Sequence, residues 1–167
     1  MTTNKSIDLA KVIIRKVETG DIEKMTEYRL AYLAELQGER EEEYKQRLRF
    51  ELSNFFESTM GKGSFFALQA EYEGEVIAFG AMVIKQIPGD FNQSSYLEGD
   101  ILNMYTIPSA RRKGISSLVL SRLIKEARQI GISKVALHTS KDGEQLYRKF
   151  GFSDPSYPYL ELGLKKE

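Results

Sequence analysis

The sequence predicts a mixed α/β fold in which one mostly antiparallel sheet is flanked by helices. Short apolar and aromatic runs bounded by turn residues indicate strands, whereas longer stretches with apolar residues every three or four positions indicate helices. A strand-like run at residues 101–107 also passes through a short basic turn into a helix-like run at 115–130. With 167 residues, the chain is long enough for one domain with a sizeable core.

The N-terminal third predicts one strand followed by two helices. Residues 12–17 form a short run typical of a strand, and Asp21 is a candidate N-cap for a helix that ends at Gly38. An acidic run at residues 39–43 opens the second helix, because negative charge suits a helix N-terminus. Charge runs usually face water, so a solvated helix start is the simplest interpretation of this run. The apolar residues at helical spacing are Ile22, Met25, Tyr28, Tyr32, Leu33 and Leu36, then Tyr44, Leu48, Leu52, Phe55 and Phe56.

The middle of the chain predicts three strands in sequence. Residues 64–72 and 75–85 are rich in apolar and aromatic residues, and the Glu73-Gly74 pair between them indicates a hairpin. Residues 86–95 hold turn-forming residues and are expected to be a loop. Residues 96–107 form the third long strand.

The C-terminal part predicts helix, strand, helix and strand. These four segments are residues 115–130, 134–138, 142–150 and 157–164. Glycines follow both helices, as is common at helix ends. We expect the strand at 134–138 to lie parallel to the one at 96–107, because a helix joins them in a right-handed crossover. The pattern therefore gives six strands and four helices.

Composition narrows the functional class. The 24 basic and 24 acidic residues give a formal net charge of zero, which disfavours a general nucleic-acid or membrane-surface binder. There is no cysteine, so disulfides, thiolate metal sites and a cysteine nucleophile are excluded. His138 is the single histidine, which excludes a multi-histidine metal site. No apolar run reaches membrane-spanning length and no signal-peptide core is visible, so we expect a cytoplasmic protein.

The basic turn at residues 111–116 is the most informative short segment. A helix N-terminus has backbone N–H groups without partners and a positive dipole end, so it binds anions. Three adjacent cationic side chains strengthen the attraction for phosphate. The turn matches neither the Walker A loop nor Gly-x-Gly-x-x-Gly. It predicts a pocket for a phosphorylated cofactor, with a basic surface turn as the alternative.

Three motifs occur together in the second half of the chain. They are the strand end at residues 103–108, the loop Arg111-x-x-Gly114-x-Ser116, and Leu146-Tyr147-x-x-x-Gly151-Phe152 about thirty residues later. Together they resemble the GNAT superfamily of acyl-CoA-dependent N-acyltransferases. Ser116 replaces the small Gly or Ala of the family loop. The segment at residues 138–143 replaces the Asn that many members have before the tyrosine. The resemblance implies one domain over residues 9–167, after a flexible N-terminus at 1–8. It also implies a sheet of about six or seven strands whose fourth and fifth strands splay apart.

The resemblance implies acetyl-CoA as cosubstrate and no metal. The pantetheine arm would pair with exposed strand backbone, and the pyrophosphate would lie on the N–H groups of the loop and helix start. The implied cofactor-binding residues are Met104, Tyr105, Thr106, Arg111, Arg112, Lys113, Gly114, Ile115, Ser116 and Ser117.

The resemblance also implies the catalytic and acceptor-binding residues. Tyr147 would protonate or hydrogen-bond the leaving thiolate, since a phenol is a reasonable donor; a core aromatic is the alternative. Glu98 and Asp100 are the nearest candidates for a general base, with a polar strand entrance as the alternative. If the strand is regular, they lie on one face, opposite Asn103 and Tyr105. The implied acceptor-binding residues are Tyr28, Arg29, Tyr32 and Asn103.

The resulting hypothesis is an N-acetyltransferase in which a primary amine attacks the thioester directly in a ternary complex. The acceptor would be a small-molecule amine or a protein amine, and a homodimer is open. A catalytically degenerate acyl-CoA sensor is the main alternative. A nucleotide-phosphate module using the basic loop alone, and a nucleic-acid contact through that loop, are the others.

Overall fold

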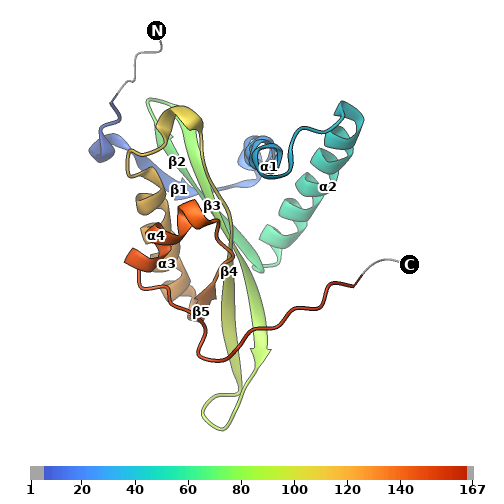
Figure 1. Cartoon of the computed structure of the whole chain (residues 1–167), viewed down its shortest axis with the longest axis vertical. Coiled ribbons are helices and arrows are strands. Elements are labelled where there is room, and N and C mark those ends of the chain that lie inside the picture. Colours follow the sequence, from blue (N-terminus) through green and yellow to red (C-terminus); the bar gives the residue numbers. More distant parts are fainter. Residues whose placement is uncertain (1–5, 165–167) are drawn as a thin grey trace. The chain divides into compact units, whose positions relative to one another are not determined.

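The computed structural model describes residues 6–164 (Figure 1). These residues divide into two compact units, one ending at Leu137 and one beginning at His138. The expected N-terminal tail falls partly outside the described residues, because the first five are not among them; residues 6–8 precede a short 3-10 helix, η1 (Leu9–Lys11). No helix among residues 6–164 is long and apolar enough to cross a membrane.

The first unit contains a five-stranded sheet and three helices. The strands are β1 (Ile13–Lys16), β2 (Phe65–Tyr72), β3 (Glu75–Pro88), β4 (Ser95–Thr106) and β5 (Ile132–Ala136). The helices are α1 (Ile22–Gln37), α2 (Glu42–Gly61) and α3 (Ile115–Ile130), with 3-10 turns η2 (Thr19–Asp21) and η3 (Pro108–Ala110). The strand order is β1-β2-β3-β4-β5. The first four strands are antiparallel and β5 is parallel to β4, which confirms the predicted mixed α/β class.

The expected strand at residues 157–164 does not form, so the described chain has five strands where six or seven were expected. A strand requires a paired neighbour, and none of the described strands pairs with this segment. Pro155 and Pro158 also remove two backbone donors from it or its approach. Side chains such as Tyr157, Leu160 and Leu162 are exposed. The apolar and aromatic side chains of this segment were therefore a local signal without a strand neighbour to support it.

The end of β3 and the capping of α1 also differ from expectation, each for an identifiable reason. β3 continues through the expected loop as far as Pro88, because Pro88 lies opposite Ser95 and the hairpin with β4 stays paired to its tip. Asp21 does precede α1, but its side chain does not cap the helix. The Asp21 carboxylate instead accepts hydrogen bonds from Arg15 at 2.7 and 2.8 Å and from the Glu18 backbone N–H at 2.9 Å.

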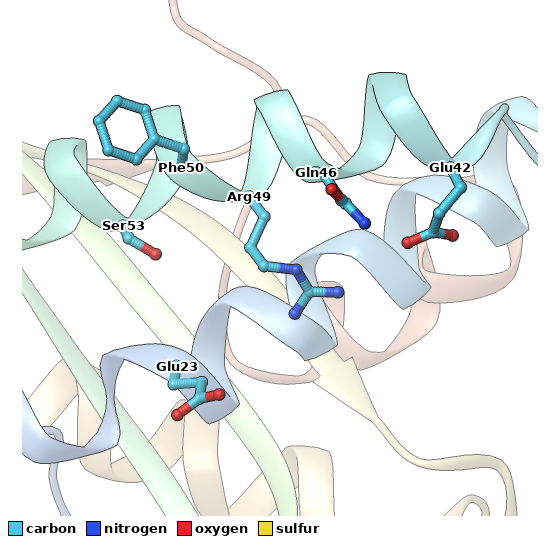
Figure 2. Close-up of a pocket in the computed structure, with 6 residues that line it drawn as sticks. All are labelled: Glu23, Glu42, Gln46, Arg49, Phe50 and Ser53. Atoms are coloured by element: carbon cyan, nitrogen blue, oxygen red, sulfur yellow. The ribbon is translucent and has the colours of Figure 1, made fainter.

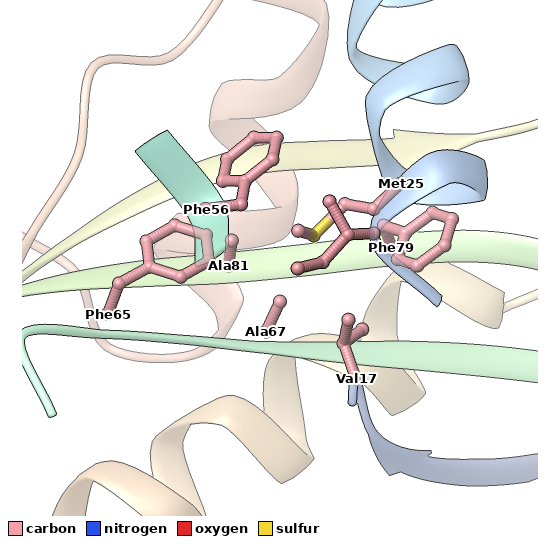
Figure 3. Close-up of a cluster of buried hydrophobic side chains, with 8 residues drawn as sticks. Val17, Met25, Phe56, Phe65, Ala67, Phe79 and Ala81 are labelled. Carbon is pink, nitrogen blue, oxygen red and sulfur yellow. The ribbon is translucent and has the colours of Figure 1, made fainter. Parts of the chain in front are cut away.

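One face of the sheet is covered by α1 and α2. Eight buried side chains from these helices, the residue after β1, and strands β2 and β3 form the core there, namely Val17, Ile22, Met25, Phe56, Phe65, Ala67, Phe79 and Ala81. Figure 3 shows the aromatic rings of this cluster around the small alanines. The rings of Phe56 and Phe65 lie 5.2 Å apart. Ala67 and Ala81 on the strands are small and leave room for these rings.

The opposite face is covered by α3, which packs closely on the centre of the sheet. A Cβ atom placed on Gly80 would lie 2.6 Å from Val119, 2.8 Å from Leu123 and 2.8 Å from the sulfur of Met104. Glycine at this position therefore lets α3 approach β3 and β4. The end of α3 is tied to β1 through the buried Glu126, whose carboxylate pairs with Lys16 at 2.8 Å.

Candidate active site

The two halves of β4 have different neighbours. Residues 97–100 pair with β3 on one side and with β5 on the other, and the β5 pairing ends at Asp100 opposite Ala136. Beyond this point, within the described chain, the sheet pairs β4 with β3 alone as far as Thr106. One edge of residues 101–106 is thus not part of a strand ladder. An extended ligand with amide groups can bind such an edge as an added strand.

A β-bulge lies within this one-sided half of β4. Phe79 lies opposite Tyr105 and Ala81 lies opposite Leu102, so β4 has one residue more than β3 in this interval. Asn103 has φ +53°, in the left-handed region that Asn tolerates better than most residues. Bulges commonly lie next to active sites, where they redirect side chains.

The bulge changes which residues of β4 share a face. Leu102 packs against the core under α1 and α2, and Tyr105 contacts Tyr28 of α1 with ring centroids 5.6 Å apart. Met104 lies on the other face, toward α3. Residues two apart share a face in a regular strand, so Asp100 lies on the face of Leu102 and hence of Tyr105. The expectation that Asp100 and Tyr105 lie on opposite faces is therefore wrong, because it assumed a regular strand.

The two carboxylates proposed as general bases both have lysine partners. Glu98 pairs with Lys134 of β5 at 2.8 Å, and Asp100 pairs with Lys85 of β3 at 2.6 Å. Both lie in the half of β4 that is paired on two sides, before the bulge. Their role as bases stays a prediction.

The basic loop has the backbone geometry of an anion site. Arg112 and Gly114 have φ +59° and +83°, and Gly114 is the N-cap residue of α3. The N-cap residue provides no side-chain hydrogen bond to this helix, which leaves its first N–H groups to other acceptors. The hydroxyls of Thr106 and Ser116 lie 3.1 Å apart and connect the end of β4 to the first turn of α3. The site therefore fits the phosphate groups predicted from the sequence.

The side chain of Arg111 is already engaged within the protein. Its Nη2 donates to both carboxylate oxygens of Glu35 at 2.7 and 2.9 Å, and its Nε donates to the Thr106 carbonyl at 2.8 Å. The Glu35 carboxylate raises the pKa of Arg111. Arg111 therefore ties α1 to the loop, and its role toward a cofactor stays a prediction. Lys113 donates to the Ser109 carbonyl at 2.9 Å, while Arg112 is exposed.

The predicted acceptor-binding residues come together between α1 and β4. Arg29 donates from Nη1 to the Asn103 side-chain oxygen at 2.6 Å, and its guanidinium lies 5.7 Å from the centre of the Tyr32 ring. Tyr28 donates to the carbonyl of Val76, so its hydroxyl has a structural partner. Burial raises the pKa of Tyr28. The residues from α1 and the bulge thus form one aromatic and polar surface.

Glu35 was not among the residues predicted from the sequence, yet it belongs to this surface. It accepts from the Tyr105 hydroxyl at 3.3 Å in addition to the bonds from Arg111. Burial, followed by the Glu35 charge, raises the pKa of Tyr105. The available signal was helical spacing, since Glu35 follows Tyr28 by seven positions and Tyr32 by three and so shares their face. A periodic pattern of apolar residues does not include Glu35, because its side chain is charged.

The second unit holds the remaining predicted catalytic residue. Tyr147 lies on α4 (Lys141–Lys149), and its ring meets Phe152 edge to face at 5.7 Å. The side chain of Ser140 caps α4 by accepting from the Gly143 N–H at 3.2 Å. The role of Tyr147 as an acid stays a prediction. His138 is largely exposed and lies 3.9 Å from the Glu161 carboxylate.

A hollow of about 670 Å³ between α1 and α2 is separate from these residues. Figure 2 shows its lining, which comes entirely from the two helices and consists of Glu23, Glu42, Gln46, Arg49, Phe50 and Ser53. No residue of β4 or the basic loop lines it. The hollow is large enough to bind a ligand. The candidate site lies elsewhere, because the open edge of β4 and the N-terminus of α3 are the groups suited to bind amides and phosphates.

Comparisons with known proteins agree with this geometry. Among solved structures, a predicted acetyltransferase with acetyl-CoA from Clostridium acetobutylicum has a TM-score of 0.78 and 30% identity, over 91% of this chain and 96% of that one. A GCN5-related N-acetyltransferase from Ralstonia eutropha has a TM-score of 0.73 and 23% identity, over 90% and 98% of the two chains.

Sequence comparison points to the same family. An IAA acetyltransferase from Azospirillum brasilense is 33% identical over 106 residues, which are 60% of this chain and 64% of that protein. The match thus spans slightly less than two thirds of the relative's length. A family model described as Acetyltransferase (GNAT) family matches residues 26–152. The split β4, the uncapped start of α3 and this match over most of the chain together show that the protein belongs to the GNAT acetyltransferase family.

Proposed function

We propose that this protein transfers the acetyl group of acetyl-CoA to a primary amine. The observation that carries the proposal is the continuity of two binding features: the one-sided stretch of β4 leads directly into the loop and the uncapped N-terminus of α3. The first feature suits the amide-containing pantetheine arm and the second suits the pyrophosphate. The similar structure from Clostridium acetobutylicum, described with acetyl-CoA, supports the same cosubstrate.

The chemistry we propose is direct attack of the amine in a ternary complex. The amine nitrogen forms a bond to the thioester carbonyl carbon, the carbon–sulfur bond breaks, and the thiolate leaves. One proton is lost from the nitrogen to a base and one is gained by the sulfur. The chain has no cysteine to carry an acyl intermediate. The protein therefore contributes mainly proximity, orientation and stabilisation of the developing thiolate.

A binding measurement tests the cosubstrate. Isothermal titration calorimetry with acetyl-CoA, run beside ATP and NAD at two salt concentrations, is expected to show preferred binding of acetyl-CoA. Gly114→Asp places a negative charge at the N-cap of α3 and is expected to abolish this binding, whereas Gly114→Ala carries the same backbone strain without the charge. Equal binding of ATP would overturn the proposal and favour a general phosphate-binding module.

The proposed function also requires that the protein turn over acetyl-CoA and an amine. The substitution Tyr147→Phe tests whether the Tyr147 hydroxyl takes part in this reaction. If the phenol protonates the leaving thiolate, removing its hydroxyl is expected to lower kcat by roughly 10²-fold while the acetyl-CoA affinity stays the same. A free-thiol assay across a panel of primary amines measures kcat, and calorimetry measures the affinity. An unchanged kcat would assign Tyr147 to packing. Tight acetyl-CoA binding without turnover of any amine would instead favour an acyl-CoA sensor.

A further inference from the structure

Arg29 is a partly buried cation that has no acidic partner among residues 6–164. In the part of the chain that the structure describes, no carboxylate lies within ion-pair distance of it; its contacts are the Asn103 side-chain oxygen at 2.6 Å and the Tyr32 ring at 5.7 Å. Neither contact carries a full negative charge. Burial accordingly lowers the pKa of the Arg29 guanidinium from its ordinary value.

Two other arginines of the first unit, the partly buried Arg15 and the more exposed Arg111, have carboxylate partners. Arg15 pairs with Asp21 and Glu71 at 2.7 and 2.8 Å, and Arg111 pairs with Glu35 at 2.7 Å. Taking a charge out of water costs free energy that a partner must offset. A guanidinium has five N–H donors, and Asn103 accepts from only one nitrogen of Arg29. Arg29 therefore has the charge and the donors to bind an anion supplied by a ligand.

The position of Arg29 relates this anion to the proposed reaction. Its partner Asn103 is the bulge residue of β4, and the next residues, Met104 to Thr106, form the edge proposed to hold the pantetheine arm. An acceptor that reaches the thioester beside this edge also comes close to the guanidinium of Arg29. The anion is thus expected to belong to the acceptor, whereas the phosphates of acetyl-CoA bind at α3.

We propose that Arg29 binds the carboxylate of the acceptor, so that the acceptor is a small amine that also carries a carboxylate, as an amino acid does. This inference rests on the proposed function. The planar guanidinium fork matches a carboxylate in two parallel hydrogen bonds. A phosphate with nearly two negative charges would need a second free cation, and the nearby Arg111 is already neutralised by Glu35.

A matched panel of amines tests the substrate class. The probes are the L-amino acids, the same compounds as carboxamides, and the pair β-alanine and O-phosphoethanolamine. Each probe is measured in two ways, by calorimetric binding to the complex of the protein with CoA and by kcat/KM in the free-thiol assay. We expect at least one amino acid to bind and react about 10- to 100-fold better than its carboxamide, the range expected for a hydrogen bond between charged groups.

Variants connect this preference to Arg29. Arg29→Gln is expected to lower kcat/KM for the preferred amino acid about 10- to 100-fold, mainly through KM, and to reduce the preference over the carboxamide. Arg29→Lys keeps the charge but loses the fork and is expected to fall between the two. Arg47→Gln is the matched control, because Arg47 also stacks on a helix tyrosine, Tyr44 at 5.4 Å, but is exposed on α2. Acetyl-CoA affinity, measured in each variant, reports that the fold is intact.

The outcomes separate this inference from the proposed function. Carboxylate-dependent binding that Arg29→Gln removes supports the inference even if turnover is absent, which would count against the enzyme alone. Turnover of carboxamides or simple amines as fast as amino acids, with no effect of Arg29→Gln, overturns the inference and leaves the acetyltransferase proposal standing. Stronger binding of O-phosphoethanolamine than of β-alanine also overturns it, in favour of a phosphorylated acceptor. Absence of binding by every carboxylate probe overturns it as well.

Discussion

At the scale of single residues, several partly buried charges of the described chain have charged partners, whereas Arg29, on which the acceptor hypothesis depends, contacts an amide oxygen and an aromatic ring. Glu126 shows the usual case. Its side chain is only 6% exposed, and its carboxylate accepts from Lys16 at 2.8 Å and from Arg122 at 3.0 Å. The bond from Lys16 is the main reason that the pKa of Glu126 is lowered. A partly buried charge that lacks such a partner and lies beside a proposed site is a candidate for binding a ligand.

The lowered pKa of Glu126 predicts how stability depends on pH. A carboxyl whose pKa is lower in the folded state stabilises the fold at pH values above its unfolded pKa of about 4.3, and this contribution is lost as the pH falls through the folded pKa. Glu126→Gln is therefore expected to cost about 1–2 kcal/mol near neutral pH, and progressively less in acid. Urea unfolding of both proteins between about pH 3 and pH 7 measures the difference. Glu57→Gln, on the exposed side of α2, is the control, and a difference independent of pH would contradict the prediction.

At the scale of elements, the packing of α3 on the sheet positions the half of β4 that carries the proposed site. Gly80 of β3 lies under α3 at the position of the bulge, between the pairs formed by Phe79 and Ala81. The bulge of β4 and the close contact between α3 and β3 therefore occur at the same place in the sheet. A change on β3 that moves α3 would be transmitted to the edge of β4 and to the loop beyond it.

Gly80→Ala tests this close contact. The new methyl group would lie 2.6 to 2.8 Å from Val119, Leu123 and Met104, so these side chains must move. We expect a loss of about 1–3 kcal/mol in the free energy of unfolding, as is typical of overpacked sites. Gly61→Ala is the matched control, because nothing lies within 4 Å of the added atom at the end of α2; there a gain of up to about 1 kcal/mol is expected. Equal effects at the two glycines, measured by urea unfolding, would argue against the contact.

The elements also show how much the sequence could predict. Periodicity located α1, α2, α3 and the hairpin of β2 and β3, because each pattern is local. The positive φ of Asn103 was not predictable, since it depends on the register between β4 and β3. The bond between Arg111 and Glu35 joins residues 76 positions apart and leaves no local pattern. The strand expected at residues 157–164 does not form for the converse reason: the composition that suggested it is local, but a strand requires a paired neighbour.

At the scale of the whole molecule, binding and stability are linked. A ligand that binds only the folded protein raises its stability by RT ln(1 + [L]/Kd), which is about 2.7 kcal/mol at a hundredfold excess over Kd. For a chain of this length we expect acetyl-CoA to raise Tm by roughly 5–10 °C. Thermal unfolding at increasing acetyl-CoA concentrations measures this shift. Gly114→Asp should remove the shift, and an equal shift with ATP would contradict specific recognition of acetyl-CoA.

The strand order has a consequence for how the sheet assembles. The strands lie in the sheet in the same order as in the sequence. The β2–β3 and β3–β4 pairs are simple hairpins, whereas α3 lies between β4 and β5 in the chain. Hairpins close short loops and form early, while a parallel pair must wait for its crossover. During synthesis, the outer edge of β4 is therefore the last part of this ladder to be covered, and residues 101–106 gain no partner from β5 even then. The same open backbone that suits a cosubstrate is a template for unwanted pairing with other chains, so a high cellular level of that cosubstrate would also guard the protein against aggregation.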